Sequence, residues 1–223
     1  MARVLVWPDC RNVRDVGGLP TTDGGRIRYG VLIRADDLAH LTAEGLDAFR
    51  AAGVRRVIDL RGTVEVAELP SPFADDPAYR WLPFIDEEAD RLRDAEAEAT
   101  VLATYRGSVN RNAANIIAGL RAFVEAPPGA VVVHCSAGKD RTGMLVALAL
   151  TVAGVAAQDV AADYAATADL NGCTPETMLG LLEHIAAEYG GVAEYLVRHG
   201  MAAAEVTALR DRLRDSLIRC SIS

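Results

Sequence analysis

The segment from His134 to Gly143 carries the clearest chemical signal in the sequence and reads His-Cys-Ser-Ala-Gly-Lys-Asp-Arg-Thr-Gly. Within it, Cys135 and Arg141 are separated by five residues that include a glycine. A Val-rich run precedes the segment and a nearly uncharged run follows it, which predicts a strand, a loop and a buried helix. Residues of these types at this spacing suit attack on a phosphate ester by a cysteine thiolate.

The loop from Cys135 to Arg141 is expected to bind a phosphate group. Its backbone N–H groups can curl around an anion, and the first turn of the next helix adds free N–H groups and the positive end of a dipole. That field also favours the thiolate form of a cysteine. The Arg141 fork would hold two phosphoryl oxygens, and the Thr142 hydroxyl would hydrogen-bond the sulfur. The predicted phosphate-binding set is Ser136, Ala137, Gly138, Lys139, Asp140, Arg141 and Thr142.

A structural interpretation of Cys135 competes with the catalytic one. Buried, inert cysteines are common at strand ends, and Arg141 would then be a surface residue. The preceding strand, Gly138, Thr142 and the apolar helix all agree with catalysis, however, because they supply the context in which such a loop works. Cys135 is therefore the predicted nucleophile.

The leaving oxygen needs a proton, and three carboxyl groups compete to supply it. Asp140 lies inside the loop, next to Arg141. Asp59 ends a predicted parallel strand, where catalytic groups of open α/β sheets gather. Asp86 follows an apolar run and ranks third. Each has a structural alternative. Asp140 would only orient Arg141, Asp59 would only pair with Arg61, and Asp86 would be one more charge in an acidic segment.

The 134–143 segment resembles the signature loop of the protein tyrosine phosphatase superfamily, in which a cysteine, five residues and an arginine precede Ser or Thr. The Gly-Lys-Asp-Arg-Thr-Gly version is similar to that of the bacterial tyrosine/serine phosphatases. Residues 12–18, 34–36 and 57–61 are also similar to segments of that subfamily. Ala35 departs from its pattern, since many members carry Ser there.

The resemblance implies a two-step reaction through a phosphocysteine, with no metal. Its implied substrate is a phosphorylated protein, most readily one carrying phosphotyrosine, although phosphoserine, phosphothreonine and phosphoinositides are associated with the subfamily. Lys139 would favour multiply phosphorylated or lipid substrates. A phosphoinositide or small-molecule phosphatase is thus the alternative enzyme, and a phosphate-binding pseudophosphatase the alternative of another class. The sequence lacks a dinucleotide-binding or Walker-type glycine loop, so no cofactor is expected.

Composition limits the other function classes. The 223 residues include 31 acidic and 23 basic residues, a net charge of -8 that argues against nonspecific nucleic-acid binding. The four cysteines lie without metal-ligand spacing and suit a reducing cytoplasm: Cys10, Cys135, Cys173 and Cys220. The longest apolar run, 142–157, falls short of the ~18 residues of a spanning helix, so no transmembrane segment is expected. A cytoplasmic location is predicted, export without a standard signal is left open, and the oligomeric state is not indicated.

The predicted elements place the loop in an α/β fold. Strands are expected at residues 2–7, 26–34, 56–60, 79–85 and 130–134, and helices at 42–52, 112–125, 142–153, 158–169, 175–189, 192–199 and 204–219. The alternation predicts a single domain over residues 1–223, with a mostly parallel central sheet flanked by helices and a helical C-terminal third. Residues 86–110 are acidic and alanine-rich, and are interpreted either as a lid-like helical insertion or as solvated helices without a gating role. Residues 12–18 predict a turn beside the site.

Overall fold

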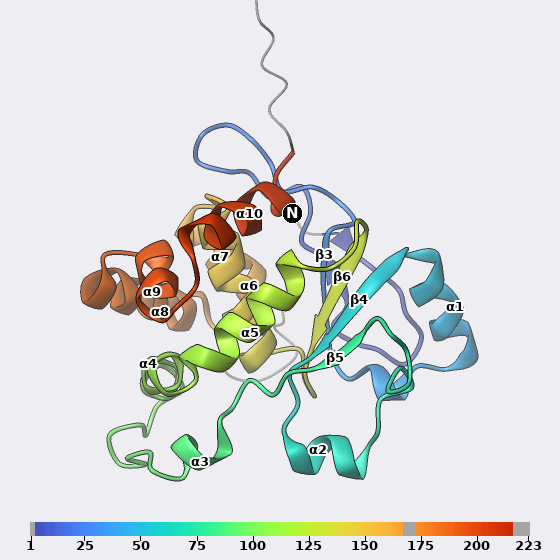
Figure 1. Cartoon of the computed structure of the whole chain (residues 1–223), viewed down its shortest axis with the longest axis horizontal. Coiled ribbons are helices and arrows are strands. Elements are labelled where there is room, and N and C mark those ends of the chain that lie inside the picture. The colour runs from blue at the N-terminus through green and yellow to red at the C-terminus, as the bar shows by residue number, and fades with distance from the viewer. Residues whose placement is uncertain (1–2, 167–172, 216–223) are drawn as a thin grey trace, which may run out of the picture.

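A sheet runs through the centre of the computed structural model, which describes residues 3–166 and 173–215 (Figure 1). In these ranges it has six strands in the order β1-β2-β3-β6-β4-β5. They are β1 (Arg3–Val4), β2 (Arg14–Asp15), β3 (Leu32–Ala35), β4 (Val54–Asp59), β5 (Tyr79–Trp81) and β6 (Ala130–His134). Strands β3, β6, β4 and β5 are parallel, and β1 and β2 join antiparallel at one edge. The predicted α/β class with a mostly parallel sheet is confirmed.

Strand β6 is buried along its whole length, as its run of Val residues predicts for a strand covered on both faces. Its last residue, His134, is in register with Ala35 of β3 on one side and with Asp59 of β4 on the other. The carboxyl ends of three strands therefore meet at one edge of the sheet. Cys135 follows directly from this edge.

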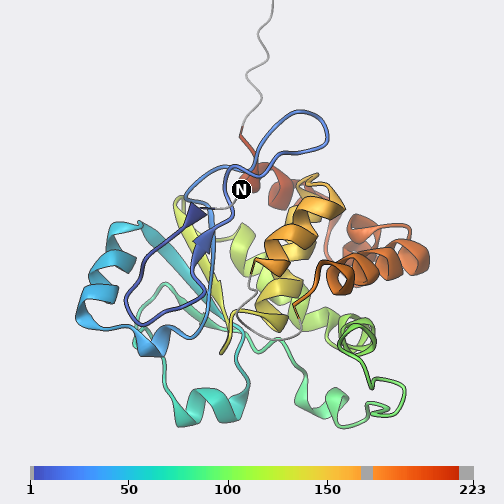
Figure 2. The ribbon, with the colours of Figure 1, turned by 180° about the vertical axis from the view of Figure 1, so that it is seen from behind.

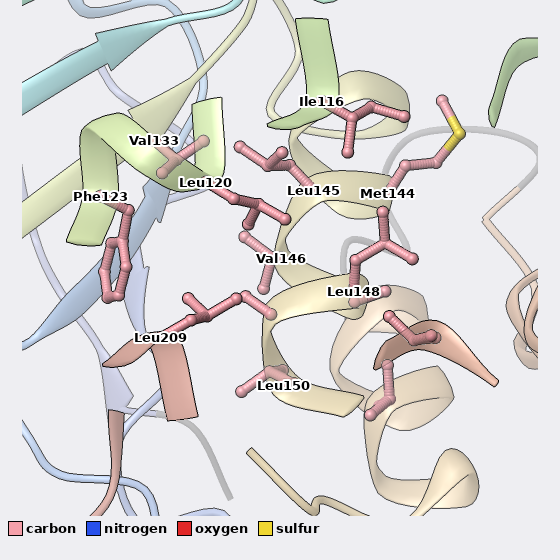
Figure 3. Packing of buried hydrophobic residues seen from close by; sticks show 14 of the residues in the cluster. Ile116, Leu120, Phe123, Val133, Met144, Leu145, Val146, Leu148, Leu150 and Leu209 are labelled. Atoms are coloured by element: carbon pink, nitrogen blue, oxygen red, sulfur yellow. The ribbon is translucent and has the colours of Figure 1, made fainter. Parts of the chain in front are cut away.

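Helices cover both faces of the sheet (Figures 1 and 2). The larger core lies under α5 (Ala113–Val124), α6 (Asp140–Val152) and α10 (Ala203–Leu213), and the smaller core under α1 (Ala43–Ala51). Neighbouring strand residues contribute to opposite cores, because side chains alternate across a strand. Figure 3 shows the packing of α5 on α6, where the side chains of Ile116 and Leu120 lie toward Leu145 and Val146.

The remaining helices of the described residues surround this framework. They are α2 (Thr63–Glu68), α3 (Glu87–Asp90), α4 (Val101–Arg111), α7 (Ala157–Ala165), α8 (Pro175–Tyr189) and α9 (Val192–Arg198), with a 3-10 turn at Leu38–His40. The helices expected after residue 157 are present, while 167–169 and 216–219, the predicted ends of two of them, lie outside the described residues. Among the described residues, no helix is both long enough and apolar enough to cross a membrane.

The segment at 86–110 is built differently from the exposed helices expected there. It consists of the short α3, a turn-rich stretch and most of α4. Helix α4 buries Tyr105, Ser108 and Val109. Arg111, at its end, pairs with Asp90 at 3.1 Å and with Glu98, so the acidic stretch is tied back to the helix. Figure 1 shows α2, α3 and α4 at the same end of the molecule.

Candidate active site

The short loop between β6 and α6 can be followed in Figure 1. It begins with Cys135, directly after the last residue of β6. Cys135 is 2% exposed. Gly138 has a φ of +62°, and a Cβ at this position would stand 2.4 Å from the carbonyl oxygen of Ala35. Only glycine combines this backbone conformation with such a close approach, so Gly138 sets the shape of the loop and its contact with β3.

Arg141, in the first turn of α6, is paired with Glu65 of α2. Its Nη2 lies 2.8 Å from Oε1 of Glu65, and Nη1 donates to the other carboxylate oxygen. The hydroxyl of Ser136 donates to the same carboxylate, and the N–H of Gly62 does so at 2.7 Å. Hydrogen bonding to Arg141 is the largest cause that lowers the pKa of Glu65, to about 2. The fork of Arg141 thus already holds an oxyanion in two-pronged geometry.

Burial by itself would lower the pKa of Arg141. The hydrogen bonds that Arg141 donates to Glu65 are the largest opposing cause, and the pKa of Arg141 lies above its usual value. Arg141 is therefore a permanent cation beside the proposed nucleophile.

Asp140 is the first residue of α6, where a carboxylate is stabilised by the helix dipole. Its side chain is 42% exposed and lies 3.6 Å from Nζ of Lys139. The hydroxyl of Tyr105 donates to Asp140, and the hydroxyls of Tyr105 and Tyr164 lie 2.8 Å apart. Burial, followed by the charge of Asp140, raises the pKa of Tyr105, which therefore stays a proton donor. The acidic segment at 86–110 thus contributes a side chain to the site.

Asp59 has a different environment, because it is fully buried and its oxygens are occupied. Oδ2 lies 2.7 Å from Nη2 of Arg61 and accepts from the hydroxyl of Tyr79 at 2.8 Å. Arg61 also reaches Asp37 at 2.9 Å. Burial would raise the pKa of Asp59, but Arg61 is the main opposing group and the pKa is lowered. The structure brings Asp59 to the edge of the sheet, with its charge directed at Arg61.

Asp86 lies on the surface and caps α3. Its Oδ1 accepts from the N–H groups of Glu88 and Ala89, both at 3.0 Å. Its own N–H donates to the side chain of Asn112. Asp86 also lines a hollow of about 380 Å³ together with Thr63 and other residues. These bonds are those of an N-cap residue, the most direct account of its position.

Two buried polar side chains that flank the loop from Cys135 to Arg141 have no hydrogen-bond partner in the part of the chain that is described. They are the hydroxyl of Thr142 and the imidazole of His134. Burial lowers the pKa of His134, and Oδ2 of Asp59 stands 3.6 Å from its Nε2. The Thr142 hydroxyl, predicted to bond the sulfur, therefore retains its hydrogen-bonding capacity at the start of α6.

Three functional candidates were not predicted from the sequence: Glu65, Tyr105 and Asp163, whose buried carboxylate pairs with Arg14 and Arg34. Glu65 lies three residues after Gly62, the residue that precedes α2. This is the spacing of a glutamate at the third position of a helix. The other two are polar groups on the buried faces of helices, and such residues are informative because burial of a polar group is costly. The residues described contain no group of three or more His, Cys, Asp or Glu arranged to hold a metal ion.

Comparisons with known proteins identify the family of the chain and several relatives. The model of a family described as the tyrosine phosphatase family matches residues 5–215. A Cupriavidus necator protein provisionally named a tyrosine-protein phosphatase is 31% identical over 72% of this chain and 61% of its own length. A tyrosine-protein phosphatase of Nostoc commune is 28% identical over 87% and 78%, respectively. The triple specificity protein phosphatase PtpB of Mycobacterium tuberculosis is 30% identical over 70% and 66%. The chain thus spans about two thirds of the length of two of these relatives.

Proposed function

The chain belongs to the tyrosine phosphatase family, and from this premise we propose that it hydrolyses phosphate monoesters through a phosphocysteine at Cys135. The proposed substrate is a phosphorylated protein, with phosphotyrosine as the preferred residue. The names of three relatives support this class of substrate, because all three describe protein phosphatases. Two of the three names specify tyrosine.

The observation that carries the proposal is the convergence of Arg141 and Ser136 on one carboxylate. Both side chains donate to Glu65 of α2. Both belong to the segment that begins with Cys135 and ends in the first turn of α6. A carboxylate and a phosphoryl group each present two anionic oxygens that can accept the paired hydrogen bonds of the arginine fork. A loop whose donors gather around such a group supports oxyanion binding beside the cysteine.

The proposed reaction has two steps. The thiolate of Cys135 attacks phosphorus, the bond to the leaving oxygen breaks, and that oxygen takes a proton from Asp140. Water then attacks the phosphocysteine, and Asp140 takes a proton from that water. The sulfur leaves as a thiolate, to which the Thr142 hydroxyl donates a hydrogen bond. Arg141 holds two phosphoryl oxygens in both steps, which supplies the electrostatic stabilisation that phosphoryl transfer depends on.

The environments of the two carboxyl groups support Asp140 as the general acid. Its side chain is 42% exposed and adjoins the loop. The side chain of Asp59 is 0% exposed and shares its oxygens with Arg61 and Tyr79. A group that must give and regain a proton in each turnover needs access to substrate and water, which Asp140 has. Asp59 is then a partner that fixes Arg61.

A second candidate function rests on Lys139. This residue is the only lysine in the sequence, and its side chain is 18% exposed next to Asp140. An ammonium group in the phosphate-binding loop suits substrates that carry a second phosphate, as phosphoinositides do. The mycobacterial relative is named a triple specificity protein phosphatase, which supports a site that accepts more than one kind of phosphoester.

The test is steady-state hydrolysis, without metal, of a phosphotyrosine peptide, a phosphoserine peptide and a set of phosphoinositides. Cys135→Ser should abolish turnover. Cys10→Ser is the matched control, because burial is the main cause that raises the pKa of the Cys10 thiol to about 12 and so keeps it protonated. Preferred turnover of phosphoinositides would select the second candidate. Turnover of none of these, together with measurable phosphopeptide binding, would identify a pseudophosphatase.

A further inference from the structure

Three consecutive carbonyl groups of the phosphate-binding loop are all bonded by groups outside the loop. The carbonyl of Ser136 accepts from the N–H of Asp37 at 3.1 Å. The carbonyls of Ala137 and Gly138 both accept from Nδ2 of Asn12, at 3.0 and 3.1 Å. Gly138 accepts in addition from Nη2 of Arg34 at 2.8 Å. Asn12 belongs to the segment 12–18, expected to form a turn beside the site, and Arg34 to the segment 34–36, which Asp37 follows directly.

The direction of these carbonyls fixes the direction of the loop N–H groups. In a planar trans peptide the C=O of one residue and the N–H of the next point in opposite directions. When carbonyls 136, 137 and 138 face Asn12, Arg34 and Asp37, the N–H groups of residues 137, 138 and 139 face away from them. Three N–H groups in succession on one side of a loop form a concave anion site.

The side-chain amide of Asn12 is held in the orientation that this requires. Its Oδ1 accepts from Nη1 of Arg14 at 2.6 Å, which directs Nδ2 toward the loop. Its backbone N–H donates to Oδ1 of Asp36 at 3.2 Å. Asn12 is 9% exposed, so water competes little for these bonds. Asn12 is thus fixed at both its backbone and its side chain.

Asp163 of α7 joins the two arginines behind the loop. Its Oδ1 lies 2.9 Å from Nε of Arg14, and its Oδ2 lies 2.7 Å from Nη1 of Arg34. Its side chain is 0% exposed. Burial would raise the pKa of Asp163, but Arg34 and then Arg14 outweigh it and the pKa is lowered. The carboxylate therefore balances two buried cations that would otherwise be costly.

We propose that Asn12 is a positioning residue for phosphate binding: it turns the carbonyls of Ala137 and Gly138 outward, so that the loop N–H groups face the phosphate. Arg34 assists at Gly138, and Asp163 and Arg14 hold Asn12 and Arg34 in place. The inference deepens the proposed function, since it assigns the phosphate-binding geometry of that same loop to a residue more than a hundred positions away in the sequence.

The test is Asn12→Asp, with tungstate and inorganic phosphate as probes. An aspartate keeps the size of the side chain and can still accept from Arg14, but it has no donor and faces two carbonyl oxygens. Calorimetry should show tungstate and phosphate binding weakened about tenfold or more, as expected for two lost hydrogen bonds. Should this variant fail to fold, Asn12→Ala removes the same donors without adding a charge.

Asn112→Asp is the matched control. Asn112 is 1% exposed, and its amide donates to the carbonyl of Ser108 at 3.0 Å, away from the loop. This variant should lose stability while keeping tungstate affinity within about twofold, which a thermal melt and the same titration measure together. If the role of Asn12 were only structural, its variants would likewise lose stability and keep their affinity for tungstate.

Three results would overturn the inference. They are tungstate affinity in both Asn12 variants within twofold of the wild type, an equal loss of affinity in Asn112→Asp, and a wild type that binds no tungstate. Because the titration needs no turnover, it separates this inference from the proposed reaction. If the wild type hydrolyses none of the phosphoesters but Asn12→Asp binds tungstate more weakly than the wild type, the positioning role is supported and the proposed hydrolysis is contradicted.

Discussion

Glu65 and Arg141 form a two-pronged ion pair between α2 and the first turn of α6, with Oε1 and Nη2 2.8 Å apart. Glu65 engages the two terminal nitrogens of the guanidinium. Because the pKa of Glu65 is lowered to about 2, the pair is ionised throughout the neutral range. It fixes the plane of the fork that is proposed to hold the phosphoryl group.

The first prediction is that Glu65→Ala lowers kcat/KM about tenfold to a hundredfold, because a loosened Arg141 no longer meets the transition state in a fixed geometry. Glu65→Gln should lose less, since the amide oxygen can still accept one of the two bonds. Steady-state kinetics on a phosphotyrosine peptide measures both. A rise in kcat/KM in either variant would mean instead that the carboxylate competes with the substrate for Arg141.

The second prediction concerns Tyr105, whose hydroxyl donates to Asp140. Tyr105→Phe should reduce kcat about tenfold with little change in KM, because the hydroxyl orients the proposed acid without contacting the phosphate. Tyr195→Phe is the control, since it also removes a buried hydroxyl, one that donates to the carbonyl of Val109 at 2.6 Å. Both should cost about 1 kcal/mol in stability. Equal kinetic effects in the two variants would contradict the prediction.

The third prediction separates the two candidate acids by the leaving group. Asp140→Asn should lower kcat by about 10² or more on a phosphotyrosine peptide, and much less on an aryl phosphate whose leaving group needs no proton. Asp59→Asn should instead cost about 3–5 kcal/mol in unfolding free energy, since it leaves Arg61 buried with one partner fewer. A leaving-group-dependent loss of kcat in Asp59→Asn, absent in Asp140→Asn, would exchange the two roles.

The part of the candidate site nearest the proposed nucleophile, Cys135, follows from local sequence. Strand β6 was predicted with the bounds that the structure gives it, because a short Val-rich run closed by a glycine-containing loop has few other interpretations. The loop and the helix after it are also marked by local sequence patterns that have few other interpretations. Local pattern therefore identifies Cys135 and Arg141, and their roles stay predictions until the kinetics are measured.

The residues that hold the loop in place could not be found in the same way. Helix α2 has six residues and buries none of them, so no apolar periodicity marks it or the position of Glu65. Asp163 lies on a predicted helix, but its partners Arg14 and Arg34 are 149 and 129 residues away. Such contacts arise from the packing of the whole chain. A single sequence shows the charges and leaves their pairing open.

The fourth prediction concerns pH and rests on His134. Its imidazole is 0% exposed, neither ring nitrogen has a hydrogen-bond partner in the described part of the chain, and burial lowers its pKa. The unfolded chain takes up a proton there at about pH 6.5, and the folded chain does so only at lower pH. Between these values the unfolded state binds more protons, so stability is complete above about pH 6.5 and falls as the pH is lowered.

The measurement is urea unfolding of the wild type and His134→Gln between pH 7 and pH 5. Glutamine stays neutral over this range, so the wild type should lose up to about 1.4 kcal/mol per pH unit more than the variant. His40→Gln is the control, because it removes an exposed imidazole and should leave the wild-type slope unchanged. If His134→Gln and the wild type fall in parallel, the imidazole takes up its proton in the folded state as well. The pairing with Asp59, 3.6 Å away, would then be the stronger influence on His134.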